Sequence, residues 1–198
     1  MKKNKYIGVC GNIASGKSTI VSLFDKQKSN IVYENFRGIL FLESFYQNPD
    51  KYSFETELSF LLQHYFFIKK AIKKYSFSIF DFSIILDRAY AEVTLSQKRK
   101  KLFQLVADDL EQEIGLPEKI IFLYCPEEIL INRIKNRNRE IEKSISIDYL
   151  TVLNQSIENQ INLVKDKIEV VRIDSNQIDF ATNKEGKSLV KSMVFRRG

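Results

Sequence analysis

A glycine-rich segment near the N-terminus constrains this chain more than any other feature. It has the spacing glycine, four residues, Gly-Lys-Ser, and it lies between an apolar run at 6–10 and a stretch with helical spacing at 20–24. This spacing between a strand and a helix is the pattern of a phosphate-binding loop. A chance glycine-rich turn would not need both flanking elements. We therefore predict that residues 11–19 bind the phosphates of a nucleotide.

Each residue type in the loop has a physical role. The two glycines let the backbone turn, so that successive N–H groups point inward and form a concave anion site. Lys17 would reach the β- and γ-phosphates, and the Ser18 hydroxyl would ligate Mg²⁺. The residues that we predict to contact the nucleotide are Gly11, Asn12, Ala14, Ser15, Gly16, Lys17, Ser18 and Thr19.

Composition narrows the class of protein. The chain has 198 residues, of which 44% are hydrophobic, with only 7 Gly and 3 Pro, so we predict one folded domain over residues 1–198. The net charge of +6 is not accompanied by a nucleic-acid recognition motif, and an anion-binding enzyme needs such cations as well. The two cysteines fit no disulfide framework, and no apolar run reaches membrane-spanning length. We therefore predict a cytoplasmic protein whose partners are neither nucleic acids nor membranes.

Short apolar runs alternate with longer segments of helical spacing, a pattern that predicts an α/β fold with a parallel sheet covered by helices. The expected strands are residues 6–10, 30–33, 83–86, 119–123 and 169–173. Apolar residues at three- and four-residue steps predict long amphipathic helices at 55–74 and 97–114. Most of these side chains would be core, but a second apolar face on each helix would also suit a dimer interface.

Ionisable residues follow two of the expected strands. Glu34 ends the second strand, where open α/β sheets place ligand chemistry, and its carboxylate could take a proton from an acceptor hydroxyl. An isolated glutamate at such a position is otherwise simply solvated. After the third expected strand, Asp87 would hold magnesium and Arg88 the phosphates, or the two would form an ion pair with each other.

Three arginines follow the fourth expected strand within seven residues, at Arg133, Arg137 and Arg139. The four-residue step places the first two on one face of a helix. Charge runs are usually solvated faces, but arginines at this density in a phosphate-binding protein indicate a lid that closes over the donor phosphates.

In chain order, these features resemble the deoxynucleoside kinase family. The resemblance also rests on Phe41-Leu42-Glu43-Ser44-Phe45-Tyr46, on Pro49-Asp50-Lys51-Tyr52-Ser53-Phe54, and on Arg172-Ile173-Asp174. It implies a P-loop kinase fold with five parallel strands and an arginine-rich lid. It further implies transfer of the γ-phosphoryl group of ATP, with Mg²⁺, to the 5′-hydroxyl of a deoxynucleoside, and a homodimer formed through a helix bundle.

The resemblance assigns roles near the phosphates. Glu34 matches the general base, and with Lys17 and Arg88 it forms the expected catalytic set. Asp87 matches the acid on the magnesium side. Arg88 and Arg139 match phosphate contacts, so the resemblance supports the lid as well.

On the nucleoside side, Tyr46 and Glu142 match the partners of the sugar 3′-hydroxyl. Glu57 stands where family members usually have a glutamine whose amide reads the base. An ionised carboxylate only accepts hydrogen bonds, so it would receive both N–H groups of guanine and repel the ring N1 of adenine. We therefore expect a guanine-type preference. The expected nucleoside contacts are Glu34, Tyr46, Phe54, Glu57, Arg88 and Glu142.

Two other functions stay open at this point. A nucleoside monophosphate kinase of the thymidylate kinase type would need a second phosphate-reading arginine near the acceptor, and Arg37 is the evident candidate. A regulatory nucleotide-binding module without catalysis would fit the presence of Glu57 where family members usually have glutamine. The presence of Glu34, Asp87 and the three arginines favours an enzyme.

Overall fold

The computed structural model describes residues 5–24 and 27–195. Within them the strands are β1 (Lys5–Gly11), β2 (Asn30–Val32), β3 (Phe77–Phe80), β4 (Lys119–Tyr124) and β5 (Glu169–Asp174). The helices are α1 (Lys17–Val21), α2 (Leu42–Gln47), α3 (Pro49–Lys74), α4 (Ile84–Thr94), α5 (Gln97–Ile114), α6 (Glu127–Arg137), α7 (Ile147–Val164) and α8 (Lys184–Phe195). Two short 3-10 helices are η1 (Phe36–Gly38) and η2 (Glu140–Glu142).

All five strands pair in parallel, in the order β2-β3-β1-β4-β5. The central strands β1 and β4 are almost continuously buried, because helices cover both faces of a sheet of this kind. Side chains alternate between the two faces, so Val9 packs in one apolar cluster and its neighbour Cys10 in another. The predicted α/β class and the five-stranded parallel sheet are confirmed.

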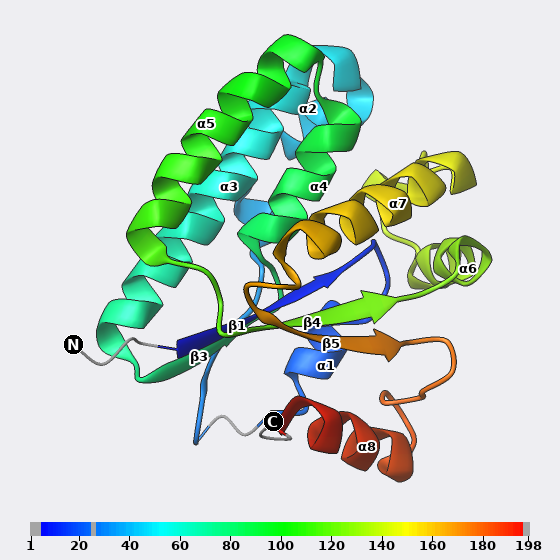
Figure 1. Ribbon diagram of the computed structural model, residues 1–198. Helices are drawn as coiled ribbons and strands as arrows, with labels where there is room; N and C mark the ends of the chain where they lie inside the picture. The colour runs from blue at the N-terminus through cyan, green and yellow to red at the C-terminus, as the bar shows by residue number, and fades with distance from the viewer. Residues whose placement is uncertain (1–4, 25–26, 196–198) are drawn as a thin grey trace.

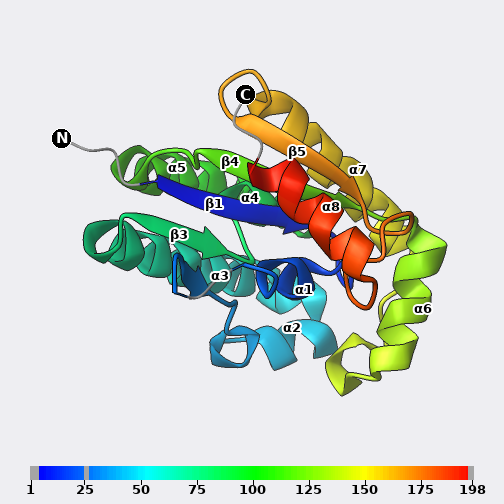
Figure 2. The same cartoon turned by 90° about the horizontal axis from the view of Figure 1, so that it is seen from below.

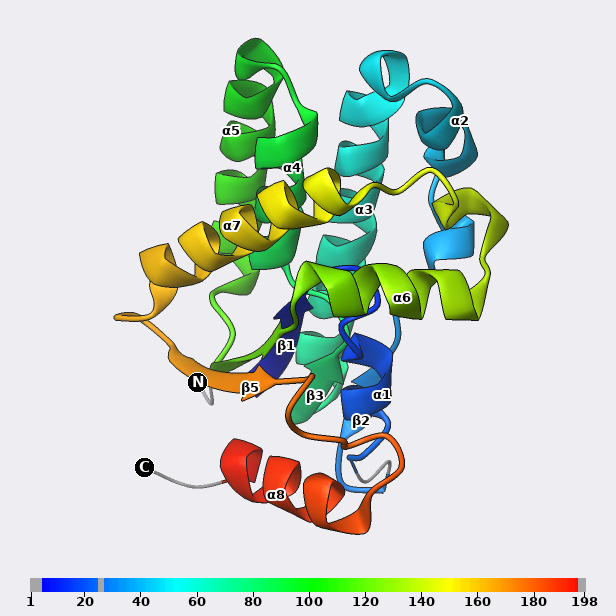
Figure 3. The ribbon, with the colours of Figure 1, turned by 90° about the vertical axis from the view of Figure 1, so that its right-hand side faces the viewer.

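The helices form a layer on each face of the sheet. Helices α3, α4, α5 and α7 cover one face (Figure 1), and α1 and α8 lie across the other (Figure 2). Helix α6 packs beside α7, and the η2 segment that follows it contacts α2 (Figure 3). The segments that follow the strands therefore gather at one end of the sheet, where α2 and α6 face each other.

The two long helices were predicted from apolar spacing. Helix α5 has the predicted bounds, Gln97–Ile114. Helix α3 begins earlier than predicted, at Pro49, because the Asn48 side chain caps it by accepting from the Lys51 N–H and the proline occupies the first turn.

The third strand was predicted wrongly. Residues 83–86 do not form a strand, and β3 lies at Phe77–Phe80 instead. Ser83 caps α4, its hydroxyl accepting from the Ile85 N–H, and the apolar run after it is buried helix. A run of three apolar residues is equally consistent with a buried strand and a buried helix start, so periodicity could not separate the two. As a result Asp87 and Arg88 lie on a helix and not at a strand end.

Both cysteines are free thiols buried in the core, Cys10 in β1 and Cys125 directly after β4. They behave as small apolar residues at the end of the sheet. Among the residues that the structure describes, no helix combines the length and the apolar character needed to cross a membrane.

Packing of α8 can be tested with two neighbouring residues. Val190 is 0% exposed and Leu189 is 48% exposed. We expect Val190→Ala to lower the free energy of unfolding by about 1–3 kcal/mol, because it removes buried methyl groups and leaves a cavity. Leu189→Ala should change it by less than about 0.5 kcal/mol. Urea denaturation measures both values, and equal losses would show that α8 does not pack on the sheet through Val190.

Candidate active site

The loops that follow β1, β2 and β3 open on one cavity of about 780 Å³, a size that suits a small-molecule site. The phosphate loop forms one wall. Residues from α2, α3 and α4 form the nucleoside-sized part opposite it, and the arginines of α6 close a third side. The cavity therefore lies at the carboxyl ends of the strands, where parallel sheets place their ligands.

The phosphate loop joins β1 to α1 and is held rigidly. Gly16 has a φ of 102°, which favours glycine, and a Cβ atom there would lie 3.1 Å from the Phe180 ring, closer than an ordinary contact. The Asn12 side chain is buried and donates to the carbonyl oxygen of Leu150 and to Oδ1 of Asn154, each at 2.8 Å. These contacts anchor the loop to α7.

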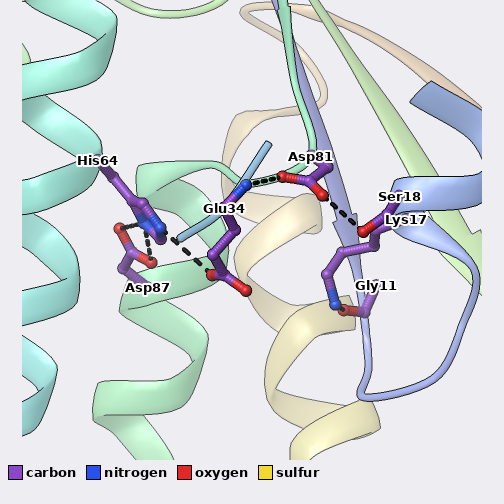
Figure 4. Close-up of polar contacts among 7 residues, drawn as sticks. All are labelled: Gly11, Lys17, Ser18, Glu34, His64, Asp81 and Asp87. Carbon is purple, nitrogen blue, oxygen red and sulfur yellow. Dashed lines mark hydrogen bonds and ion pairs between the residues drawn. The ribbon is translucent and has the colours of Figure 1, made fainter. Parts of the chain in front are cut away.

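The predicted loop residues divide into two groups. Ala14, Ser15, Gly16, Lys17, Ser18 and Thr19 line the cavity, whereas Gly11 and Asn12 lie behind it and shape the turn. The Lys17 Nζ donates to the carbonyl oxygen of Gly11 at 2.9 Å (Figure 4). It also donates to the carbonyl oxygen of Asn12 at 3.2 Å. Burial lowers the pKa of Lys17 although nearby carboxylates oppose the shift. A phosphate in the loop would add negative charge next to this half-buried amine.

Asp81 is a site residue that the sequence analysis missed. It follows β3 directly, and its Oδ2 accepts from the Ser18 hydroxyl at 2.6 Å. Its Oδ1 accepts from the backbone N–H of Glu34 at 2.5 Å (Figure 4). Burial raises the pKa of Asp81 in spite of these hydrogen bonds. An acidic residue after a buried strand was the available signal, and it was overlooked because the strand was placed at 83–86.

The donor set at Ser18 and Asp81 fits Mg²⁺. This ion is commonly held by one or two protein oxygens together with phosphates and water. The candidate metal pair is therefore Ser18 with Asp81, in place of the predicted Ser18 with Asp87.

Glu34 lines the cavity between the phosphate loop and His64 (Figure 4). Its Oε1 lies 3.3 Å from His64 Nε2. Burial opposes ionisation, but the close contact with the charged His64 ring, followed by Lys17 and Arg139, outweighs it and lowers the pKa of Glu34. The group is therefore a carboxylate at neutral pH and is able to accept a hydrogen bond from a hydroxyl.

His64 and Asp87 form a buried pair behind Glu34. The His64 Nδ1 lies 2.9 Å from both carboxylate oxygens of Asp87. Burial lowers the pKa of His64, but Asp87 and then Glu34 more than offset it and raise the value to about 10. Both oxygens of Asp87 are thus engaged by an imidazolium, which does not fit the predicted role of this residue as a magnesium ligand. His64 is the single histidine of the chain and belongs to no motif, so the sequence analysis did not identify it.

Arg88 was predicted to contact phosphates or nucleoside, but in this structure it pairs with acidic side chains away from the cavity. Its guanidinium lies 2.8 Å from Oδ1 of Asp108 and 3.3 Å from Oε2 of Glu111, both on α5, and it does not line the cavity. Because Asp87 and Arg88 are consecutive on a helix, they cannot point to the same side. Phe54 is also outside the cavity, with its ring 4.3 Å from the guanidinium carbon of Arg99.

Glu57 and Tyr46 do line the cavity. Glu57 is 4% exposed, and its Oε1 accepts from the Thr94 hydroxyl at 2.9 Å. Burial raises the pKa of Glu57 to about 8, with Thr94 acting in the opposite direction and the charge of Asp87 adding to the increase. Burial likewise raises the pKa of Tyr46 to about 12, so its hydroxyl keeps its proton.

The three arginines all line the cavity. Arg133 donates to the carbonyl oxygen of Ser175 at 2.7 Å and to its hydroxyl at 3.2 Å. Arg137 and Arg139 bind the buried carboxylate of Glu142 at 2.6 Å and 3.4 Å. The structure thus brings these residues together at one wall, and closure of a lid stays a prediction.

Comparison with known proteins gives the family of this chain. The family described as deoxynucleoside kinase matches residues 7–196. The chain is 29% identical over 196 residues to deoxyguanosine kinase of Bacillus subtilis (strain 168), covering 93% of each chain. It is 25% identical over 193 residues to deoxyadenosine kinase of Dictyostelium discoideum, covering 94% of this chain and 78% of that one.

Among solved structures, deoxyadenosine kinase from M. mycoides with bound dATP has the same fold, with a TM-score of 0.82 and 22% identity, covering 96% of this chain and 100% of that one. This agreement confirms the P-loop kinase architecture. Since the family match spans nearly all of the sequence, this chain belongs to the deoxynucleoside kinase family of phosphotransferases.

Proposed function

We propose that this chain is a cytoplasmic kinase that transfers the γ-phosphoryl group of ATP to the 5′-hydroxyl of a deoxynucleoside. One observation supports this reaction most strongly. Asp81 connects the Ser18 hydroxyl to the backbone of Glu34, so the phosphate loop and an ionised carboxylate face one cavity. In the reaction a bond forms between the 5′-oxygen and the γ-phosphorus, the bridging bond to the β-phosphate breaks, and Glu34 receives the hydroxyl proton.

Phosphoryl transfer depends mainly on positioning and on charge neutralisation. Lys17 and the loop N–H groups would bind the donor phosphates, and Ser18 and Asp81 would hold Mg²⁺, which neutralises phosphate charge when bound. On lid closure Arg137 and Arg139 would exchange the Glu142 carboxylate for phosphate oxygens. Such closure would exclude water and so limit hydrolysis of the donor.

Release from the arginines would free Glu142 to join Tyr46 at the sugar 3′-hydroxyl. Tyr46 on α2 and Glu142 in η2 line the same cavity, and their two elements are in contact. The Tyr46 hydroxyl would donate to the sugar 3′-hydroxyl and the Glu142 carboxylate would accept from it. This pair of hydrogen bonds would fix the sugar, so that its 5′-hydroxyl faces Glu34.

The role of Glu34 is tested by Glu34→Gln, which keeps the shape of the side chain and removes the base. We expect kcat to fall about 10²–10⁴-fold. Binding of a non-hydrolysable ATP analogue should change by less than about threefold, because Glu34 acts on the acceptor. Glu140→Gln, the same change at an exposed glutamate outside the cavity, is the control. Unchanged turnover in Glu34→Gln would contradict the proposed mechanism.

We also propose a guanine-type preference, with Glu57 as the base-reading group. Its ionised carboxylate can accept both N1–H and the exocyclic N–H of guanine, whereas the protonated form donates one hydrogen bond and accepts another, as adenine requires. With a pKa of about 8, both forms are populated near neutral pH. The name of the Bacillus subtilis relative supports guanine and that of the Dictyostelium relative adenine, so Glu57 protonation offers a physical basis for a mixed specificity.

This proposal predicts a specificity that changes with pH. The ratio of kcat/KM for deoxyguanosine to that for deoxyadenosine should rise on the order of tenfold between about pH 6.5 and about pH 8.5, because Glu57 loses its proton in this range. In Glu57→Gln the ratio should favour deoxyadenosine and stay constant with pH. A substrate panel at several pH values measures this. A constant ratio in the native enzyme, or deoxyadenosine preferred throughout, would refute the guanine assignment.

The two other functions considered have lost support. Arg37 is exposed and does not line the cavity, and its guanidinium carbon lies 6.0 Å from the Phe36 ring centroid. It is therefore not placed to read an acceptor phosphate, as a thymidylate-type kinase would require. A regulatory module without catalysis is at odds with the kinase names of the relatives that match most of the chain.

We propose a homodimer formed through α3 and α5. These helices leave large apolar side chains exposed, among them Phe66 (57%) and Leu105 (67%). Light scattering should give twice the mass of one chain for the native protein. Leu105→Glu should shift it toward the monomer, because a charge would be buried at the interface, while Leu189→Glu on α8 should not. A native monomer would refute the dimer.

A further inference from the structure

A buried histidine stands behind Glu34 and has no part in the mechanism above. His64 is 2% exposed, and its Nδ1 lies 2.9 Å from both oxygens of Asp87. On the other edge of the ring, Nε2 lies 3.3 Å from Oε1 of Glu34. Among the described residues this nitrogen has no regular hydrogen-bond partner, so the contact with Glu34 is its main polar interaction.

The His64 ring is fixed in three directions. Asp87 binds one edge, Glu34 lies at the opposite edge, and Phe82 stacks on the face with the centroids 4.0 Å apart and an angle of 9° between the planes. Asp87 and Phe82 are themselves buried. A ring held in this way cannot turn to another partner without breaking the pair with Asp87, so Nε2 points at Glu34.

The Glu34 carboxylate needs such a constraint. Asp81 fixes the backbone of Glu34, but the side chain beyond it has three rotatable bonds and is 29% exposed to the cavity. A base that orients a hydroxyl must be held within a fraction of an ångström, since a displacement of about 1 Å can cost on the order of 10²-fold in rate. Lys17 and Arg139 attract the same carboxylate from the phosphate side. Without an opposing contact, the carboxylate would pair with these cations instead of the acceptor.

We propose that His64 is a positioning residue, which donates from Nε2 to one oxygen of Glu34 and leaves the other oxygen to accept the hydrogen bond of the nucleoside 5′-hydroxyl. This inference rests on the role of Glu34 proposed above. Asp87, with both oxygens on Nδ1, holds the ring and keeps it charged, so both ring nitrogens carry a proton. Asp87 therefore holds His64 in place, and His64 in turn holds the Glu34 carboxylate toward the reacting hydroxyl.

A cation behind the base is compatible with phosphoryl transfer. It reduces the basicity of Glu34, which would be harmful if the proton had to be removed early. In a loose transition state the attacking oxygen needs alignment more than early deprotonation. His64 thus keeps Glu34 ionised and oriented. The rest of the transition-state stabilisation comes from charge neutralisation at the phosphates.

Two amide substitutions separate the two edges of the ring. The Asn side-chain nitrogen takes the place of Nδ1, and that of Gln takes the place of Nε2. His64→Asn therefore keeps a donor for Asp87 and loses the one for Glu34, while His64→Gln does the reverse. We expect kcat to fall about 10- to 100-fold in His64→Asn, with the nucleoside KM changed less than about threefold. In His64→Gln, which keeps the donor for Glu34 but loses the anchor to Asp87, we expect a smaller loss of kcat, about three- to fivefold. Deoxyguanosine and deoxyadenosine with ATP are the substrates, and binding of an ATP analogue verifies that each variant is folded.

A double-mutant cycle tests whether His64 acts through Glu34. In a Glu34→Ala background, His64→Asn should cause no further loss of kcat, because the group that it positions is already gone. A purely structural histidine would give losses that multiply, and would give equal losses in the Asn and Gln variants. Either of these results, or full activity of His64→Asn, overturns the inference. Full activity of Glu34→Ala alone would instead refute the proposed function of Glu34.

Should the His64 variants fail to fold, Asp87→Asn provides the second route. It keeps the shape of the residue and removes the charge that anchors the ring. We expect kcat to fall severalfold with ATP-analogue binding unchanged, and no further loss on adding it to Glu34→Ala. Native kcat in Asp87→Asn would contradict the proposed role of Asp87 and His64. A further loss of kcat on adding Asp87→Asn to Glu34→Ala would contradict it as well.

Discussion

The two hydrogen bonds accepted by the Asp81 carboxylate set the relative positions of the phosphate loop and Glu34. One bond comes from the Ser18 hydroxyl at the start of α1, and the other comes from the backbone N–H that follows β2. Since β1, β2 and β3 are parallel, their ends meet at one edge of the sheet, and a single side chain can reach both neighbours. The site thus depends on a sheet register that places the ends of these strands at one level.

On the nucleoside side the structure relies on buried ionisable groups whose surroundings separate their pKa values. His64 is held charged by Asp87 and Glu34, whereas Glu57, a few turns away on the same helix α3, has its pKa raised by burial. One group is a fixed cation and the other changes state near neutral pH. Environment, more than residue type, therefore sets the charge of each group: His64, proposed to position Glu34, and Glu57, proposed to read the base.

Much of the fold could be predicted from local patterns. The phosphate loop is defined by its own spacing, and α5 by a long run of helical periodicity, so both were placed correctly. The strand β3 was missed because its four residues have weak alternation, while the more apolar run after it belongs to the buried start of α4. Because of that one shift, Asp87 was predicted as the acid at the strand end in place of Asp81, and Arg88 was predicted beside the phosphates although it pairs with α5 in the folded chain. His64 could not be found, since its importance arises from Asp87 and Phe82, which are distant in sequence and meet it only in the folded chain.

The most direct measurement is a crystal structure of the native enzyme with a deoxynucleoside and a non-hydrolysable ATP analogue bound together. The account predicts the 5′-oxygen within about 3.2 Å of a Glu34 carboxylate oxygen, with the γ-phosphorus on its other side and the phosphates in the loop at 11–19. A nucleoside whose 5′-oxygen lies out of reach of Glu34, or a Glu34 side chain turned away from the sugar, would contradict it.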